Sequence, residues 1–459
     1  MNFYDEDVND EKKELTTTLN TGKNKTEVFN KKEKTHESIN FHKIYILILA
    51  FMILNDYKYD FNSKIINVAF YCRSIRNGGV ERVMALLINL LSEEKIFNLY
   101  LITDDGKFED EYHISKNIKR IDLPEIKMNI FKIIQREHID IFIYNYYYKP
   151  DIKKLHKLKK TKVIVYNHSS YFFWIVTQNI YKFEESIYET YKDCKYVISL
   201  IPIENDYLFK KWGINSVLMD NPLTFEYDSV IPSDLSQNNI IMIGRGDDHQ
   251  KRYDIGIKSM KYIIKEIPEC KMYILSTINE KLRYLIGSLN LEQNIQFTGY
   301  QKSIEMYLKN ASLHIFPSIG ESYGMVLSET KIFGIPTILC GLDYLALAEG
   351  GTVIIYDDNP VTLAKEAIKI LKNDTYRKRL GNEARKSMEK RTNKLLAKRW
   401  VKFLLAVIKD DKESFKELSE HQLSKEKIKN IMENQLKLIH MRIPELKNLT
   451  MEQLESYSF

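Results

Sequence analysis

The sequence predicts an α/β protein with two domains in tandem, each a doubly wound parallel sheet covered by helices on both faces. Three observations predict it. From residue 65 onward, short apolar runs alternate with segments of helical periodicity. The alternation begins a second time near residue 239, and the polar stretch 228–238, which contains Pro232, separates the two series. Alternating strands and helices favour parallel sheets, and polar stretches with proline favour linkers. We therefore expect two Rossmann-like domains facing a cleft.

The first series begins with the apolar run 65–71, which reads as a buried strand. A glycine-containing turn follows, and then Val80, Val83, Met84 and Leu87 fall at helical spacing. Further strands of this series are expected at 97–103, 139–145, 162–167 and 195–201. We predict that this series forms an N-terminal domain over residues 63–230.

The second series predicts a C-terminal domain over residues 236–410. Its strands are expected at 239–244, 271–276, 295–298, 312–317, 336–340 and 352–356. Its helices are expected at 254–267, 361–373, 375–390 and 393–409. The charged tail 411–459 has helical periodicity interrupted at Pro444, and we expect it to be mostly helical.

The N-terminal extension, residues 1–62, has a different composition. Its first 40 residues contain nine acidic and seven basic side chains, so we expect them to be disordered or loosely packed. The apolar segment 44–54 is shorter than the about 20 residues that a membrane-spanning helix needs. We expect it to pack on the first domain, with peripheral contact to a membrane surface as the alternative.

Composition and charge narrow the class of protein. The chain has 459 residues and a formal net charge of +6 spread along its length, which does not favour nucleic acid as a partner. Its four cysteines are Cys72, Cys194, Cys270 and Cys340, and none forms a C-x-x-C pair. We expect buried free thiols and a cytoplasmic location, with membrane association left open.

Three turns that follow predicted strands are candidates for ligand contacts, because open α/β sheets bind ligands beyond the carboxyl ends of their strands. In the first, Gly78 and Gly79 precede a helix. Glycine lets backbone N–H groups approach an anion, and the helix N-terminus adds partial positive charge. A tight turn without a ligand is the alternative.

The second turn follows the strand expected at 239–244 and contains Arg245 and Lys251. These two cations on one loop could converge on a diphosphate, the arginine as a planar fork and the lysine as a point charge. The alternative is a pair of solvated surface cations.

The third turn runs from a strand through a glycine-bearing loop into a helix and contains Glu321 and Glu329. If a helix connects them, eight positions amount to about 12 Å of rise, which is too far for two carboxylates to share a proton. The spacing suits two contacts along one extended ligand. Backbone N–H groups near Tyr323, Gly324 and Met325 would lie at the helix N-terminus, ready for phosphate or sugar oxygens.

Together, in this order, the three turns resemble glycosyltransferase family 4, a group of retaining enzymes with the GT-B fold, over about residues 65–410. The resemblance rests on Gly-Gly-x-Glu-Arg at 78–82 and on Gly-Arg…Lys-x-x-Asp at Gly244, Arg245, Lys251 and Asp254. It also rests on Glu-x7-Glu at Glu321 and Glu329, and on Asn221-Pro222 before the linker. Arg252 departs from the pattern, since many members have glycine there.

The resemblance implies a role for each matched residue. Arg245 and Lys251 would hold the diphosphate of a nucleotide-sugar donor, and Gly79 would approach it from the other domain. Glu321 would bind the transferred sugar and Glu329 the ribose, while His168 would lie near the reacting carbon. The remaining donor-binding residues that we expect are Gly78, Gly299, Tyr300, Tyr323, Gly324, Met325 and Val326.

The resemblance implies a hexosyltransferase that uses a nucleotide-sugar donor, with UDP as the preferred nucleotide, and a glycan or lipid-linked acceptor. No metal-binding D-x-D motif lies in a plausible catalytic loop, so we expect catalysis without a metal or a further cofactor. Two alternatives stay open. One is a nucleotide-sugar epimerase, which would need no acceptor, or another GT-B enzyme. The other is a non-catalytic carbohydrate-binding protein, which would show neither donor hydrolysis nor transfer.

Overall fold

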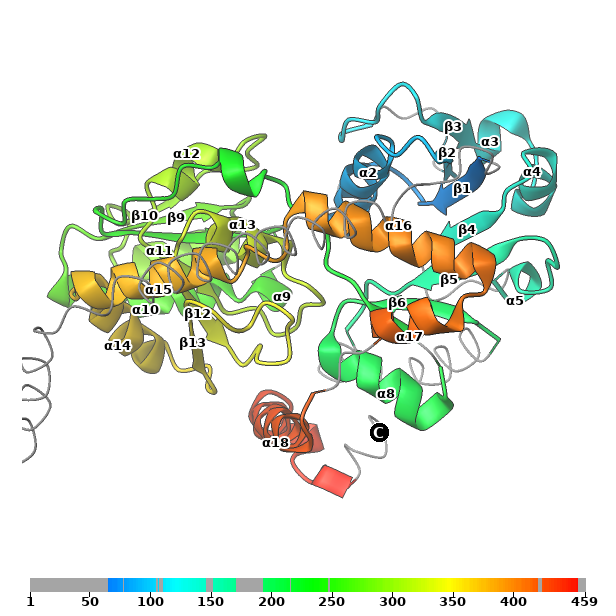
Figure 1. Cartoon of the computed structure of the whole chain (residues 1–459). Coiled ribbons are helices and arrows are strands. Elements are labelled where there is room, and N and C mark those ends of the chain that lie inside the picture. The colour runs from blue at the N-terminus through cyan, green and yellow to red at the C-terminus, as the bar shows by residue number, and fades with distance from the viewer. Residues whose placement is uncertain are drawn as a thin grey trace, which may run out of the picture. The chain divides into compact units, whose positions relative to one another are not determined.

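The computed structural model describes residues 65–76, 78–104, 106, 110–145, 152–170, 193–214, 216–246, 248–419 and 423–452. The predictions for residues 1–62, including segment 44–54, fall outside these residues. Residues 65–459 form one compact unit. It contains two parallel sheets with helices against their faces, which confirms the predicted α/β class (Figure 1).

The first sheet has seven strands in the order β3-β2-β1-β4-β5-β6-β7, and every pair of neighbours is parallel. Apolar runs explain its centre, because β1, β4, β5 and β6 are buried along most of their length. The strands are β1 (Ile66–Tyr71), β2 (Phe97–Thr103), β3 (Lys119–Asp122), β4 (Ile141–Tyr144), β5 (Lys162–Tyr166), β6 (Tyr196–Ser199) and β7 (Ser216–Leu218). The helices between them are α2 (Gly79–Leu91), α3 (Leu123–Ile126), α4 (Ile130–Arg136), α5 (Ile152–Leu155) and α8 (Pro202–Trp212).

The second sheet has six strands in the order β10-β9-β8-β11-β12-β13, again all parallel. Its strands are β8 (Asn239–Ile243), β9 (Lys271–Leu275), β10 (Ile295–Phe297), β11 (Leu313–Phe316), β12 (Thr337–Cys340) and β13 (Thr352–Ile355). Its helices are α9 (Asp248–Lys251), α10 (Tyr253–Glu266), α11 (Glu280–Ser288), α12 (Glu305–Lys309), α13 (Met325–Ile332), α14 (Pro360–Leu371) and α15 (Asp374–Lys386). One apolar core joins the buried faces of α10 and α14 to the central strands.

Helix α16 (Asn393–Lys409) follows the second sheet in the chain but packs on the first. It contacts α2 (Figure 1). Its buried Trp400 lies against the rings of Phe70 and Tyr166. The ranges 63–230 and 236–410 stay predictions as domain limits. The tail then forms α17 (Lys412–Ser419) and α18 (Lys425–Arg442), and short 3-10 turns occur at Tyr227–Ser229 and Pro444–Leu446.

Two details of the sequence-based interpretation need correction. Strands β3 and β7 were not among the predicted strands, because β3 has the charged sequence KRID and β7 has only three residues. The helix considered between Glu321 and Glu329 begins only at Met325, so Glu321 lies on the preceding loop. The four cysteines are buried thiols outside any disulfide among the described residues, as expected.

Candidate functional site

The candidate site lies at the carboxyl end of the second sheet, in the loops that follow two neighbouring strands. Strands β8 and β11 pair directly, so the loops that follow them meet at one edge. The first loop carries Arg245 and leads into α9, which ends at Lys251. The second loop carries Glu321 and leads into α13. The topology therefore brings together residues that are 70 positions apart in the chain.

Lys251 and Glu321 form an ion pair at this edge. The Lys251 Nζ lies 2.5 Å from the Glu321 Oε1, and the two side chains are only 12% and 13% exposed. The lysine ammonium also lies 5.7 Å from the centre of the Phe316 ring. Gly244 makes room for the lysine, because a Cβ on it would meet the Lys251 side chain at 3.0 Å and the Tyr253 hydroxyl at 2.9 Å. A charged pair with limited access to water can fix a polar ligand in one orientation.

Hydrogen bonds join the two loops along their backbones. The Ile319 N–H donates to the Gln250 carbonyl at 3.0 Å, and the Gln250 side-chain amide donates to the Gly320 carbonyl at 3.0 Å. The buried Tyr344 hydroxyl bonds both the N–H and the carbonyl of Glu321, each at 3.2 Å. The backbone that carries Glu321 is therefore held on two sides.

The other glutamate, Glu329, lies on α13 and is fully buried. Its Oε1 accepts hydrogen bonds from the guanidinium of Arg82 and, at 2.6 Å, from the hydroxyl of Thr224. Arg82 comes from α2 beside the first sheet and also donates to the Thr224 hydroxyl at 2.7 Å. The glutamate thus joins a helix of the second sheet to a helix of the first. Sequence reasoning matched Arg82 to a motif but gave it no role, and it missed Thr224, which stands two residues after Pro222.

The second oxygen of Glu329 has no partner within the described part of the chain, although it is buried. A buried carboxylate oxygen without a hydrogen-bond donor lowers the stability of the folded state, and native proteins rarely contain one. A hydroxyl group of a ligand could donate to it. This oxygen therefore makes Glu329 a candidate contact for a polar ligand.

The N-terminus of α13 lies between the two glutamates. Gly324 precedes the helix with a φ of 79°, a left-handed conformation that favours glycine. Tyr323 and Gly324 are buried, while Met325 and Val326 are partly exposed at the start of the helix. The first N–H groups of a helix have no partner within it, and they favour an oxygen-rich ligand.

His168 reaches the site from the first sheet, just after β5. Its Nε2 lies 3.1 Å from the Asn145 Oδ1, and its ring packs on Tyr166 with centroids 4.0 Å apart. Its backbone carbonyl accepts a hydrogen bond of 2.5 Å from the hydroxyl of Ser322, which is next to Glu321. Burial lowers the pKa of His168 to about 3, so the imidazole is neutral near pH 7.

The glycines of the first turn lie at the start of α2. Gly78 precedes the helix in an extended conformation, and Gly79 is its first residue. A Cβ on Gly78 would overlap the Glu81 carboxylate, whereas a Cβ on Gly79 would meet no atom of the described residues within 4 Å. Protein packing therefore does not require glycine at position 79.

The remaining predicted residues make fewer contacts. The Arg245 side chain is exposed, and its Nη2 lies 3.4 Å from the Gln250 Oε1; its backbone carbonyl accepts a bond from the Tyr253 hydroxyl. Gly299 follows β10 with a φ of 71°, and Tyr300 beside it is 71% exposed. Within the described residues, neither Arg245 nor Tyr300 forms a hydrogen bond or ion pair with Lys251 or Glu321.

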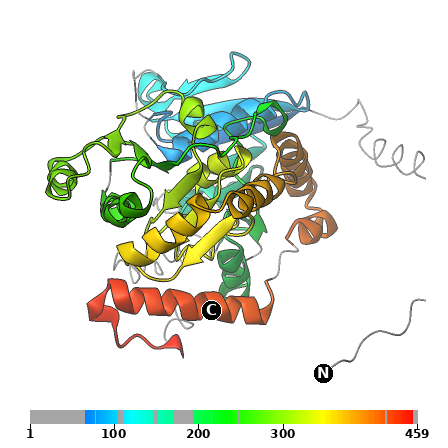
Figure 2. The same cartoon turned by 90° about the vertical axis from the view of Figure 1, so that its left-hand side faces the viewer.

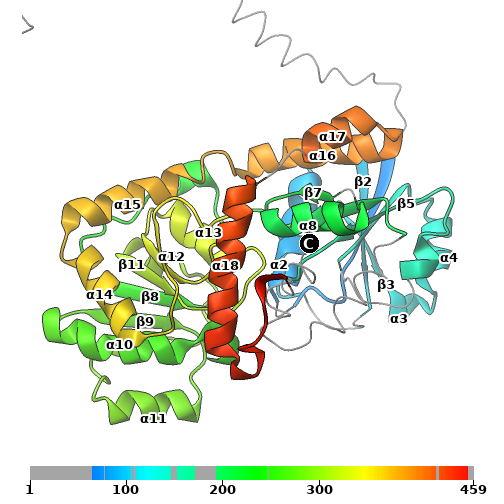
Figure 3. The same ribbon diagram turned by 90° about the horizontal axis from the view of Figure 1, so that it is seen from below.

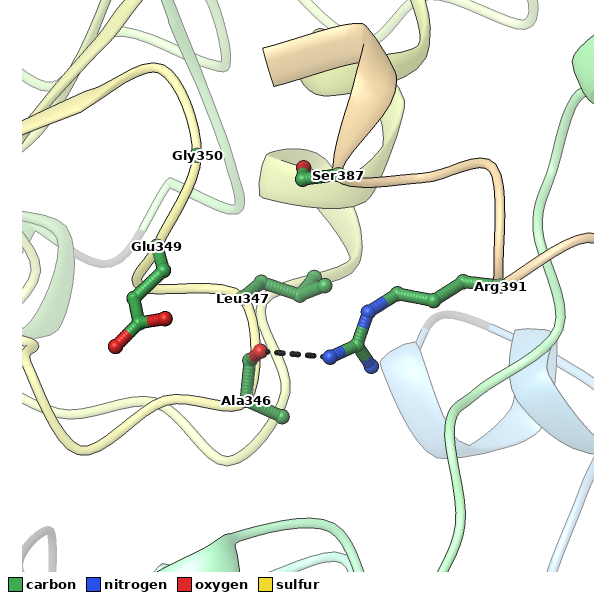
Figure 4. A pocket seen from close by; sticks show the side chains of 6 residues that line it. All are labelled: Ala346, Leu347, Glu349, Gly350, Ser387 and Arg391. Carbon is green, nitrogen blue, oxygen red and sulfur yellow. Dashed lines mark hydrogen bonds between the residues drawn. The ribbon is translucent and has the colours of Figure 1, made fainter. Parts of the chain in front are cut away.

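A cavity of about 320 Å³ lies elsewhere in the second half of the chain. Figure 4 shows Arg391 pointing towards Ala346, whose carbonyl accepts a hydrogen bond of 3.0 Å from the guanidinium. The lining residues are Ala346, Leu347, Glu349, Gly350, Ser387 and Arg391. None of them belongs to the predicted site, so the cavity is not the candidate site.

Comparisons with known proteins show the fold and the class of protein to which the chain is similar. Residues 225–387, which include the whole second sheet, match the family model of glycosyl transferases group 1. Over 367 residues the chain is 20% identical to a Campylobacter jejuni enzyme, GalNAc-alpha-(1->4)-GalNAc-alpha-(1->3)-diNAcBac-PP-undecaprenol alpha-1,4-N-acetyl-D-galactosaminyltransferase. That match covers 74% of this chain and 98% of the relative.

Solved structures share the fold. Sucrose-phosphate synthase from Thermosynechococcus elongatus superposes with a TM-score of 0.64 at 15% identity, over 75% of this chain and all of the other. Anabaena HepE in complex with UDP and glucose gives a TM-score of 0.57 at 14% identity, over 74% of this chain and all of the other. The chain therefore has the GT-B fold. With the family match and the relative, it is a glycosyltransferase.

Proposed function

We propose that this glycosyltransferase takes a hexose-type sugar from a UDP-linked donor and transfers it, with retention of configuration, to a glycan or lipid-linked acceptor. The observation that carries the proposal is the unpartnered Oε2 of Glu329, buried one helix turn inside α13. A ribose hydroxyl is a suitable donor for it. The complex of HepE with UDP and glucose supports a UDP-linked donor on the same fold.

The diphosphate would lie between the two loops at the end of β8 and β11. Lys251 and Arg245 would supply positive charge there, and the first N–H groups of α13 would supply aligned donors. Gly79 faces open space and would let the backbone of α2 approach the same phosphates. Gly299 and Tyr300 would lie near the base. Charge on the departing diphosphate would be stabilised by groups that are already in place.

The sugar would lie against Glu321, whose carboxylate is oriented by Lys251 and whose backbone is held by Tyr344. His168 would lie near the reacting carbon as a neutral imidazole. In a front-face reaction the bond between the sugar carbon and the phosphate oxygen breaks, and its electron pair goes to the diphosphate. The acceptor oxygen bonds the same carbon from the same side and gives its proton to the leaving phosphate.

The acceptor is proposed from relatives. The C. jejuni relative is named for an undecaprenol-linked glycan acceptor, and a second relative from Staphylococcus aureus is named poly(ribitol-phosphate) alpha-N-acetylglucosaminyltransferase. A lipid-linked acceptor would bring the enzyme to a membrane surface. Of the helices in the described residues, none is sufficiently long and apolar for a membrane span. A cytoplasmic enzyme with peripheral membrane contact is the arrangement we propose.

The proposal is tested by incubating the full chain with a panel of nucleotide sugars and measuring release of the nucleoside diphosphate, with and without a short lipid-linked glycan. We expect hydrolysis of a UDP-sugar and faster release of UDP with the acceptor. NMR should show that the product has the same anomeric configuration as the donor. EDTA should leave the rate unchanged. Release of nucleotide with no product glycan at any acceptor would favour an epimerase-like enzyme. Absence of both hydrolysis and transfer would favour a carbohydrate-binding protein.

A further inference from the structure

The C-terminal helix α18 lies outside the range matched by the family model, which ends at residue 387. It nevertheless contacts the segments that follow β11, β12 and β13 of the second sheet (Figure 2; Figure 3). Ser424 caps its N-terminus, and its buried face includes Leu438 and Ile439. A Cβ on Gly341 would lie 2.1 Å from a methyl group of Leu438, so the helix packs closely on this backbone. Helix α18 is therefore a packed element of the second sheet.

Arg442 at the end of α18 makes the most extensive contacts. Its side chain is only 6% exposed and forms a bidentate pair with Asp358, at 3.0 and 2.9 Å. The same guanidinium donates to the carbonyl of Ile319 at 3.3 Å and to that of Cys340 at 3.2 Å. Ile319 stands two residues before Glu321, so Arg442 holds the loop that carries this glutamate.

Asp358 extends the contact to the other loop. It also accepts a hydrogen bond of 3.0 Å from Arg252, the residue after Lys251. Burial by itself would raise the pKa of Asp358, but the hydrogen bonds and charges of Arg442 and Arg252 hold it below its ordinary value. The carboxylate is therefore ionised near pH 7 and connects α18 with both loops.

A second set of contacts starts about two turns earlier on α18. The side-chain amides of Asn434 and Gln435 donate to the two oxygens of Asp343 at 3.0 and 2.8 Å, and Gln435 also donates to the Gly341 carbonyl at 2.7 Å. Tyr344 directly follows Asp343 in the chain, and its hydroxyl forms hydrogen bonds with the backbone of Glu321. Helix α18 thus reaches Glu321 by two separate routes.

We propose that α18 supports the donor site by positioning the loops that carry Lys251 and Glu321. The residues of α18 that do so are Arg442, Asn434 and Gln435. Arg442 is a positioning residue, since it acts through these loops. The inference rests on the proposed function, because it assumes that the two loops bind a nucleotide sugar. A displacement of about 1 Å in such a loop can cost about a hundredfold in rate.

The test compares Arg442→Met, which keeps most of the side-chain volume, with Arg442→Lys and with Lys429→Ala. Lys429 is on the same helix, 71% exposed, and pairs only with Glu433 among the contacts of the described chain. We would measure UDP-sugar hydrolysis, giving kcat and donor KM, together with the thermal midpoint. Arg442→Met should lower kcat/KM by about ten- to a hundredfold. Arg442→Lys should recover part of the loss, and Lys429→Ala should match the wild type.

A second variant distinguishes a positioning role for Arg442 from a purely structural one. Arg442→Met leaves Asp358 with one cation fewer, so the thermal midpoint of this variant should fall. Arg442→Met with Asp358→Asn removes the excess charge and should recover the midpoint while kcat/KM stays low. Recovery of kcat/KM along with the midpoint would overturn the inference. So would wild-type kinetics in Arg442→Met. If the wild type hydrolyses no nucleotide sugar, the proposed function fails first, and the two failures are distinguishable.

Discussion

The two sheets contribute to the candidate site in different ways. On the second sheet, the loops after β8 and β11 are joined by side-chain and backbone hydrogen bonds, and they hold Lys251 and Glu321 in contact. The first sheet contributes a few separate groups, of which Arg82 and the carbonyl of His168 touch the second sheet. The comparison indicates that the proposed donor side is held together within one sheet. The first sheet would complete it from outside through groups such as Arg82.

The largest effect is expected at the Lys251–Glu321 pair. Lys251→Met or Glu321→Ala should lower kcat for UDP-sugar hydrolysis by about a hundred- to a thousandfold, because each removes a preorganised charge next to the donor. Steady-state kinetics measure the loss. Lys258→Ala is the matched control, because Lys258 pairs with Asp254 on an exposed helix surface and should keep full activity. A fully active Glu321→Ala enzyme would contradict the assignment of this sheet as the donor side.

The next effect tests whether the first sheet completes the site. Arg82→Ala leaves the buried Glu329 charge with Thr224 as its one remaining partner among the described residues, which should cost about 3 kcal/mol of unfolding free energy, measured by urea titration. The donor KM should rise at the same time. Arg82→Ala with Glu329→Gln should regain stability but not donor affinity. If that double variant bound the donor normally, Glu329 would have no role in binding.

At Gly79 we expect two smaller effects of opposite sign, one on stability and one on donor affinity. Alanine at this position meets no atom within 4 Å, so Gly79→Ala should raise stability by about 0.5 kcal/mol, as alanine does in a helix. Donor affinity, measured by calorimetry with UDP, should fall about tenfold if the backbone approaches the phosphates as closely as proposed. Gly287→Ala in α11 is the control and should raise stability alone, since its Cβ would stay 3.5 Å from the nearest atom. Unchanged UDP affinity in Gly79→Ala would remove this turn from the site.

The last prediction concerns the pH dependence of stability at His168. Burial lowers its pKa from 6.5 to about 3 in the folded protein, so the unfolded chain binds more protons between these values. Its contribution to stability is present above about pH 6.5 and is lost as the pH falls towards 3. Denaturant titrations of wild type and His168→Gln should therefore converge as the pH is lowered from 7 to 4. A constant difference across this range would show that His168 is not desolvated.

The fold was largely predictable because the buried strands are continuous apolar runs and the helices have apolar faces at regular spacing. Strand β2 was predicted at its observed limits, and most others within one or two residues. The sheet on which α16 packs could not be predicted, since an apolar helix face does not indicate which of two sheets covers it. Of the site, the motifs indicated Lys251 and Glu321 separately. Their contact depends on β8 and β11 being neighbours, which no local pattern encodes.

The roles of Arg82, Thr224 and Arg442 were beyond sequence reasoning for a related reason. Each acts through a partner distant in the chain, such as Glu329, which stands 247 positions after Arg82. An arginine on a helix is more often a surface residue than the partner of a buried carboxylate. Only the folded chain distinguishes the two.

A crystal structure of the full chain with UDP tests the central claim most directly. The diphosphate should lie between Lys251, Arg245 and the N-terminus of α13, with a ribose hydroxyl within hydrogen-bonding distance of the Glu329 Oε2. UDP bound instead in the cavity lined by Ser387 and Arg391, or on the first sheet alone, would contradict the account.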